Sequence, residues 1–234
     1  MTLFAVVASV IALAGCSSPR PATDAVAGAH GGHGAAAKPR ATLLGNLGSF
    51  GRPITTTSAE AQRFFDEGLT LLYGFNHEEA FRSFARAAEL DDRAPMPHWG
   101  MALALGTNIN DPAPDERVMK AHTHLVEAQA RAGKGSPVEQ ALLAALARRY
   151  VAAPTGDPAA REQAYSDAMG EVASRFPDDR DVATLYAESL MNLRPWRLYD
   201  ASGAPAPGTD RIVATLERVL AADPNHPGAN HYYI

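Results

Sequence analysis

Histidine is the residue type in this chain with the clearest potential for chemistry. His98, His226 and His231 fall in three segments that combine histidine with tryptophan, tyrosine or asparagine. Neutral imidazoles are good ligands for zinc, copper or iron, so these histidines are candidates for binding a metal ion or a small molecule. His226 and His231 are five positions apart and would lie about 140° apart around a helix, so the pair cannot bind one metal by itself. The sequence therefore predicts His231 as a weak metal candidate, with no assembled metal site and no cofactor.

The same three segments contain residues suited to binding a protein or peptide. Both tryptophans of the chain occur there, and aromatic rings stack while amide side chains form hydrogen bonds. The stretch from 193 to 209 is longer than a connection between two helices requires, and such loops are often functional. For His98 and Trp99, packing within an ordinary helix is the alternative interpretation. The candidate partner-binding residues are His98, Trp99, Asn108, Asn110, Trp196 and Tyr199.

Motifs of catalytic sites are incomplete in this sequence. The segment from His77 begins like a zinc-protease helix, but Phe81 occupies the position of the second histidine. His122 and His124 are two positions apart on a predicted helix, where their side chains diverge. The glycines around Lys134 lack the earlier glycine of a phosphate-binding loop. We therefore predict that the protein is not an enzyme.

A helix–turn–helix unit over residues 58–92 is the strongest structural signal. Gly68 and Ala80 are small where two antiparallel helices must approach closely, and large residues fill the seam between them. The positions that carry the pattern are Phe64, Gly68, Leu71, Ala80, Phe84 and Ala87. Their spacing resembles a tetratricopeptide (TPR) repeat. Because one pair cannot bury its seam alone, this resemblance implies a stack of helix pairs.

Helical patterns separated by Pro/Gly turns continue along the chain. Ser58 and Ser136 are predicted N-caps, and Pro137 and Pro227 suit the first turn of a helix. After helices at 59–73 and 77–90, further helices are predicted at 94–105, 115–132, 136–151, from the turn at 154–158 to 176, 180–193, 209–222 and from 227 onward. Few segments alternate with period two, so β structure is not expected. We predict an all-α fold, a TPR-like right-handed α-solenoid of antiparallel helix pairs.

The histidine-containing segments also resemble a family of uncharacterised, exported bacterial TPR proteins. The resemblance rests on a His-Trp-Gly helix at 98–100, a Pro-Trp loop at 195–196 and a His-Pro-Gly-Ala-x-His-Tyr-x-Ile segment at 226–234. It covers residues 58–234 and implies no known activity. The family usually continues with a further His-rich helix, so we expect the chain to be truncated at its C-terminus. Histidines beyond the fragment end would then complete any ligand site.

Cys16 is the single cysteine, and its context indicates a lipid anchor. It follows an uncharged apolar run from Leu3 to Gly15 that is too short to span a bilayer. Leu13-Ala14-Gly15-Cys16 is similar to the lipobox of bacterial lipoproteins, which implies a signal peptide at 1–15 and lipidation of Cys16. Ser17 after the cysteine implies an outer-membrane location facing the periplasm. The alternative is a short buried helix with an incidental cysteine.

Residues 16–52 are rich in Ala, Gly, Pro, Ser and His, which is typical of a flexible tether before a folded domain at 53–234. His30 and His33 in this tether are interpreted as part of a spacer. A net charge of -5 without a Lys/Arg block argues against nucleic acid as a partner. The predicted function is a membrane-anchored TPR scaffold that binds a protein or peptide partner in the cell envelope. The alternative is a metal- or small-ligand-binding protein, with or without catalysis, that uses His98, His231 and histidines beyond residue 234.

Overall fold

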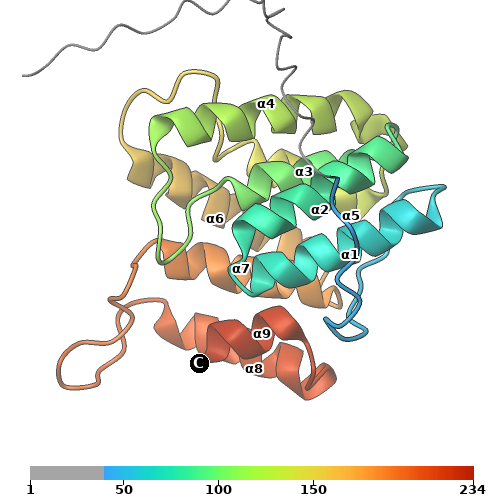
Figure 1. The fold of residues 1–234 in the computed structure, drawn as a ribbon. Coiled ribbons are helices and arrows are strands. Elements are labelled where there is room, and N and C mark those ends of the chain that lie inside the picture. The colour runs from blue at the N-terminus through green and yellow to red at the C-terminus, as the bar shows by residue number, and fades with distance from the viewer. Residues whose placement is uncertain (1–39) are drawn as a thin grey trace, which may run out of the picture. The chain divides into compact units, whose positions relative to one another are not determined.

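The structure, a computed structural model, describes residues 40–234, and every structural statement below concerns this part of the chain. This part contains nine α-helices and no β-strand (Figure 1). The helices are α1 (Ala59–Tyr73), α2 (His77–Leu90), α3 (Pro95–Ala104), α4 (Asp115–Arg131), α5 (Pro137–Leu146), α6 (Pro158–Arg175), α7 (Arg180–Asn192), α8 (Thr209–Ala222) and α9 (Pro227–Tyr233), and a 3-10 turn, η1 (Ala132–Lys134), follows α4. The prediction of an all-α fold is confirmed. None of these helices has the length and apolar character needed to cross a bilayer.

Side-chain capping hydrogen bonds are present at five of the nine helix starts in the described chain. The hydroxyl of Ser58 accepts a hydrogen bond from the backbone N–H of Ala61, and Ser136 forms a reciprocal capping box with Glu139. Such contacts satisfy N–H groups that have no partner within the helix, so the predicted starts agree with the structure. The predicted end of α5 at residue 151 differs, since the helix ends at Leu146. The chain turns there, and Arg149 in this turn donates a hydrogen bond to the carbonyl oxygen of Thr107 at 2.7 Å.

Consecutive helices pack in pairs along the chain, from α1 on α2 to α8 on α9. In addition, α9 contacts both α1 and α7 (Figure 1). In a solenoid each unit contacts only its neighbours, so a contact between the first and last described helices departs from the predicted pattern. Gly228 makes this approach possible, because a Cβ at that position would lie 2.6 Å from the ring of Tyr73.

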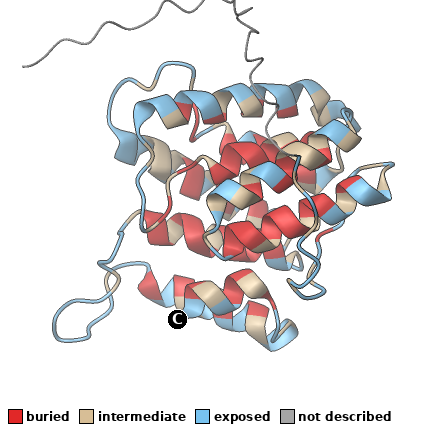
Figure 2. Ribbon diagram, viewed as in Figure 1, coloured by how far each residue is buried: buried red, intermediate tan, exposed pale blue. Residues whose placement is uncertain are grey.

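The centre of the described domain is apolar, and α3 lies within it (Figure 2). Nine of the ten residues of α3 are buried, and His98 is the exception. Trp99 on the same helix is only 1% exposed. Burial on nearly all sides explains why α3 lacks the polar face that a surface helix has.

Phe84 on α2 holds three consecutive helices together. Its ring is fully buried and lies against Gly68 of α1 and Gly100 of α3. A Cβ added at Gly68 would lie 2.7 Å from the Phe84 ring, and a Cβ added at Gly100 would lie 2.6 Å from it. Both distances are shorter than Cβ atoms adopt in proteins, so neither position has room for a side chain. The role predicted for Gly68 in the seam is therefore supported, and Gly100 contributes equally on the other side of the ring.

An extended segment over residues 40–57, here called the strap, lies against the helices although the sequence placed residues 40–52 in the tether. Its backbone N–H groups donate to helix side chains: Leu44 to Glu67 at 2.7 Å and Thr55 to Glu139 at 2.7 Å. Arg52 of the strap is only 6% exposed. Side chains on the helices thus accept hydrogen bonds from the strap's backbone, which allows a segment without helix or strand to be ordered.

We expect Gly68→Ala and Gly100→Ala each to lower the free energy of unfolding by about 1–3 kcal/mol, because each overpacks the Phe84 ring. Chemical denaturation should show this loss, and adding Phe84→Leu should restore part of it. Gly133→Ala is the matched control, since a Cβ at Gly133 meets no atom within 4 Å. Equal stability of all three alanine variants would contradict the role of the ring.

Candidate functional site

A groove of about 630 Å³ is the strongest candidate site in the described chain. It lies where the α1–α2 turn, the α3–α4 loop and the α7–α8 loop meet α7, α8 and α9. Figure 1 shows the two loops on the same side of the molecule. We call it the aromatic groove; it is lined by Phe75, Ile109, Asn110, Met191, Trp196, Leu198, Tyr199, Thr209, Ile212, Val213, Leu216, His231, Tyr232, Tyr233 and Ile234.

Large apolar side chains in this groove are exposed to solvent. Trp196, Tyr199 and Tyr233 are 76%, 54% and 46% exposed. The lining within the described chain contains no Asp, Glu, Lys or Arg. Contiguous exposed apolar surface on a folded domain commonly marks a binding site, and this groove presents aromatic rings with few neutral polar groups.

Two strained backbone positions both lie in the aromatic groove. Phe75 has φ of 58° and Trp196 has φ of 59°, and they are the only non-glycine residues of residues 40–234 with positive φ. This left-handed region costs a bulky residue about 1–2 kcal/mol, and such strain concentrates at functional sites. Both residues project an aromatic ring into the same groove, so the strain coincides with the placement of candidate binding groups.

Phe75 occupies a position at which glycine is the usual residue. The N–H groups of Phe75 and Asn76 donate to the carbonyls of Leu72 and Leu71, which is the hydrogen-bond pattern of a Schellman helix end. The left-handed residue in that motif is usually glycine, whereas here Gly74 comes one position too early. The sequence analysis recognised the turn but not the role of Phe75.

Hydrogen bonds within the α7–α8 loop fix the position of Tyr199. The carboxylate of Asp200 accepts from the N–H of Ser202 at 2.8 Å, from its hydroxyl at 2.6 Å and from the N–H of Ala204 at 3.0 Å. These hydrogen bonds hold the pKa of Asp200 below its usual range, and the bond from the Ser202 hydroxyl has the largest effect. The carbonyl of Leu198 accepts from Ala206 at 2.8 Å. The loop is therefore shaped before any partner binds.

Asn108 and Asn110 have different roles in the α3–α4 loop. Asn108 is 7% exposed and exchanges backbone hydrogen bonds with Asp111, while its Oδ1 accepts from the N–H of Asn110 at 2.9 Å. Asn108 thus shapes the turn, and Asn110 is the member of the pair that lines the aromatic groove.

His231, which the sequence analysis gave as a weak metal candidate, lines the aromatic groove. Its Nδ1 is bonded to the backbone carbonyl of Tyr73, and its ring lies 4.6 Å from that of Phe75. A carbonyl only accepts, so Nδ1 carries the proton in the neutral ring and Nε2 is the acceptor. Within residues 40–234 no group of three or more His, Cys, Asp or Glu side chains is placed to hold a metal.

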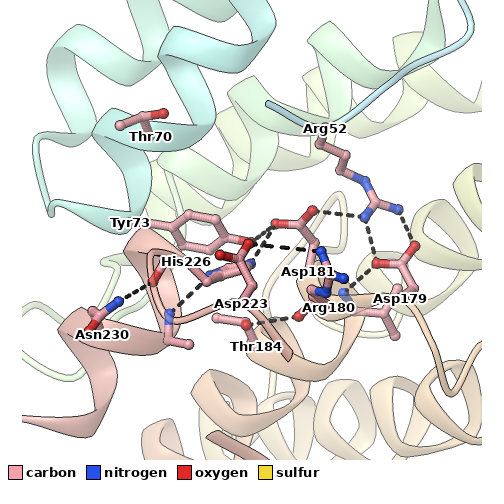
Figure 3. Close-up of polar contacts among 12 residues, drawn as sticks. Arg52, Thr70, Tyr73, Asp179, Arg180, Asp181, Thr184, Asp223, His226 and Asn230 are labelled. Carbon is pink, nitrogen blue, oxygen red and sulfur yellow. Dashed lines mark hydrogen bonds and ion pairs between the residues drawn. The ribbon is translucent and has the colours of Figure 1, made fainter. Parts of the chain in front are cut away.

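A buried polar network fixes α9, and so one wall of the groove (Figure 3). Arg52 of the strap binds Asp179 through two contacts of 2.6 and 2.8 Å and reaches Asp181 at 3.1 Å. The hydroxyl of Tyr73 donates to Asp181 at 2.7 Å. Nε2 of His226 lies 3.4 Å from the same carboxylate oxygen. Asp181 thereby joins the strap, α1, α7 and the start of α9.

His226 is a structural residue in this network rather than a groove residue. Its Nδ1 accepts the backbone N–H of Ala229 at 3.1 Å and caps α9, which leaves the proton on Nε2, directed to Asp181. Burial by itself would raise the pKa of Asp181, but contacts with His226, Arg52 and Tyr73 together lower it below its usual range. Charge compensation by Arg52 is what permits a carboxylate at this depth.

The remaining predicted site residues lie away from the aromatic groove. His98 sits between α3 and α4, where its ring is 6.5 Å from that of His124. Burial, with smaller effects of Arg131 and His124, lowers the pKa of His98 to about 4. Trp99 is enclosed in the core, so no partner can reach its ring in this structure. Cys16, His30 and His33 lie outside the described residues.

The structure therefore brings together Asn110, Trp196, Tyr199 and His231 and separates them from His98 and Trp99. Sequence reasoning missed Phe75, Arg52, Tyr73 and Asp181. No local signal identifies the last three, because their contacts join segments more than a hundred residues apart. Comparisons with protein-family models, curated proteins and solved structures give no match for this chain.

Replacing Asp181 tests the buried network. We expect Asp181→Asn to lower the free energy of unfolding at pH 7 by about 3 kcal/mol, because it leaves Arg52 less fully paired. The folded pKa of Asp181 is lowered, so its contribution is present above the unfolded pKa of about 3.9 and is lost as pH falls through the folded pKa. The difference between wild type and variant should therefore shrink below about pH 4.

Denaturation at several pH values measures this difference. Asp178→Asn is the control, since Asp178 is exposed, and it should change stability by less than about 0.5 kcal/mol. A pH-independent effect of Asp181→Asn would contradict the ionised network.

Proposed function

We propose that this protein is a lipid-anchored, non-enzymatic scaffold of the bacterial cell envelope that binds a polypeptide partner in the aromatic groove. The observation that carries the proposal is the groove itself. It combines four sequence-predicted candidates, Asn110, Trp196, Tyr199 and His231, with Phe75, and both Trp196 and Phe75 are held at positive φ. A strained backbone and an exposed ring at Trp196, on a braced loop, are better explained by binding than by packing.

The chemistry of the groove indicates the kind of partner. Its uncharged aromatic lining suits large apolar side chains, which contribute most of the affinity at protein interfaces. The side-chain amide of Asn110 offers one donor and one acceptor group, as a peptide backbone does, and Nε2 of His231 offers an acceptor. A short segment with two or three bulky apolar residues and available backbone amides fits this arrangement.

A TPR-like architecture is part of the same proposal. The packing of Phe84 against Gly68 and Gly100 has the small-to-large complementarity expected of stacked repeat pairs. The helices also pack with their chain neighbours. The contact of α9 with α1 makes the array more closed than an ideal solenoid, and it places α9 where it forms one wall of the groove.

The alternative function, a metal or small-ligand site shared by His98 and His231, has less support. His231 lines the groove and His98 lies at the α3–α4 interface beside His124. Binding of a polypeptide requires only His231 and its aromatic neighbours, and it does not require His98. It therefore explains the positions of the two histidines better than a shared metal or small-ligand site does.

The membrane location follows from the N-terminal sequence. The apolar run and Leu13-Ala14-Gly15-Cys16 support lipidation, and residues after Cys16 would connect the lipid to the domain. We therefore place the domain at the outer membrane, facing the periplasm.

Peptide binding tests the groove. Peptides selected from a random displayed library on the full chain should be rich in large apolar residues. Their affinity, measured by fluorescence polarisation, should fall by at least about 30-fold in Trp196→Gly, the loss expected for a buried aromatic anchor. Glycine suits φ of 59°, so this change removes the ring while relieving backbone strain.

Met119→Ala is the matched control, because Met119 is an exposed apolar residue of α4 outside the groove. It should leave peptide affinity unchanged. Equal binding by wild type and Trp196→Gly would place the partner elsewhere. Turnover of a small molecule by the full chain would refute the non-enzymatic part of the proposal.

Lipidation has its own test. Cys16→Ala should prevent lipid attachment, so that the protein fractionates as soluble or unprocessed instead of with membranes. Metabolic labelling with an alkyne fatty acid should label wild type and not the variant. Membrane association and correct cleavage of Cys16→Ala would show that the lipoprotein interpretation is wrong.

A further inference from the structure

A second polar cluster is enclosed where α5, α6 and α7 meet. Arg149, just after α5, binds Glu162 of α6 at 2.7 Å and the carbonyl oxygen of Thr107 at 2.7 Å. Its guanidinium lies 4.9 Å from the ring centre of Tyr165 and 5.7 Å from that of Tyr150. These contacts place three polar side chains and one backbone carbonyl around the buried guanidinium.

Glu188 and Asn192 of α7 complete the cluster. Asn192 donates to Oε1 of Glu188 and to the carbonyl of Thr107 at 3.4 Å. The charge of Glu188 also acts on the hydroxyls of Tyr150 and Tyr165. The side chains of Glu188, Asn192, Tyr150 and Tyr165 are each at least nine-tenths buried.

Polar atoms without a hydrogen-bond partner concentrate in this cluster. Within residues 40–234 nine buried side-chain nitrogen or oxygen atoms have none. Five of them are here. Oε2 of Glu162 is ion-paired with Arg149 at 2.7 Å, and the other four have no such partner: Oε2 of Glu188, Oδ1 of Asn192 and the hydroxyl oxygens of Tyr150 and Tyr165. Buried polar atoms are nearly always paired, so several unpaired oxygens at one place indicate a bound water or ion. All four can act as acceptors, which favours a positively charged guest.

The charges of the cluster agree with that conclusion. One guanidinium and two carboxylates face one another, which leaves one negative charge uncompensated when all are ionised. The tyrosines add no charge, because burial raises the pKa of Tyr150 to about 12 and that of Tyr165 well above its usual value, so both hydroxyls stay neutral. An uncompensated buried charge is strongly unfavourable, so a proton or a cation must balance it.

We propose that a single small monovalent cation, an alkali ion or ammonium, binds between Glu188 Oε2, Asn192 Oδ1 and the hydroxyl oxygens of Tyr150 and Tyr165. One positive charge neutralises the cluster, whereas a divalent ion beside Arg149 would leave an excess. Gly106 packs directly against the Tyr150 hydroxyl, where a Cβ would lie 1.9 Å from the oxygen, so the backbone closes the cluster on that side. The site lies outside the aromatic groove, since none of these four residues lines the groove.

Protonation of Glu188 competes with the cation. Burial raises the pKa of Glu188 to about 7, against the opposing effects of Arg149 and of the hydrogen bond from Asn192. A raised carboxyl pKa means that the protonated form is favoured in the fold, and that stability is lost as pH rises through about 7. A bound cation replaces the proton above that pH. Cation binding should therefore strengthen as pH rises.

The proposal is tested by measuring the Tm of the full chain in sodium, potassium, caesium or ammonium chloride. The reference is the Tm in choline chloride at the same ionic strength. At pH 8.5 one or more small cations should raise Tm by about 3–6 °C for each tenfold increase above the dissociation constant. The increase should be much smaller at pH 6. Choline is too large to enter, so it controls for general screening.

The variants Glu188→Gln and Tyr165→Phe distinguish loss of the cation site from loss of the folded structure. Each keeps nearly the same shape, so both should fold, and both should lose most of the cation-dependent shift. Glu171→Gln on the exposed face of α6 should keep it. A Tm that is the same in all salts, a preference for Ca²⁺, or an undiminished shift in folded Glu188→Gln would each overturn the proposal.

Discussion

The buried carboxylate of Asp181 is the interaction on which the arrangement of this domain depends. It accepts from Tyr73, lies beside His226 and is compensated by Arg52, so that four segments meet at one side chain. Buried charge of this kind contributes little net stability compared with apolar packing, but it is intolerant of misplacement. Its effect is to specify how α9 sits on α1 and α7. The position of α9 then determines one wall of the aromatic groove.

Apolar packing and polar bracing act at different places in the structure. The Phe84 ring and the two glycines around it set how closely α1, α2 and α3 approach, and they use size complementarity alone. The groove is built differently, because its aromatic residues are exposed and cannot be held by burial. Hydrogen bonds to Asp200, to the carbonyl of Leu198 and to the carbonyl of Tyr73 hold its loop and helix in place. Such preorganisation reduces the entropy that a partner's binding must overcome.

The interior cluster around Arg149 connects with the groove through the α3–α4 loop. Arg149 and Asn192 both donate to the carbonyl of Thr107, which comes immediately before the turn that carries Asn110 to the groove. Tyr232 lines the groove while its hydroxyl experiences the charge of Glu188. The polar interior and the apolar binding surface therefore share structural supports.

The sequence by itself determined the all-α class, most helix ends and the seam of the first helix pair. These features depend on interactions within a few residues, such as the Ser136 capping box or Pro227 in a first turn, and on the helical period that aligns Gly68 with its neighbours. It also identified Asn110, Trp196, Tyr199 and His231 as candidates, because they fall in segments where histidine, asparagine and large aromatic residues are concentrated.

Only the tertiary structure decided which candidates share a site. It encloses Trp99 and separates His98 from the groove. It also adds Phe75, whose positive φ could not be predicted from the residue type. It also orders the strap through Arg52, which is 129 positions from Asp181. Contacts of this range depend on how helices cross and on which charges must be compensated where they meet. Local sequence patterns do not encode those angles, so the network and the groove emerge only when all the helices are packed.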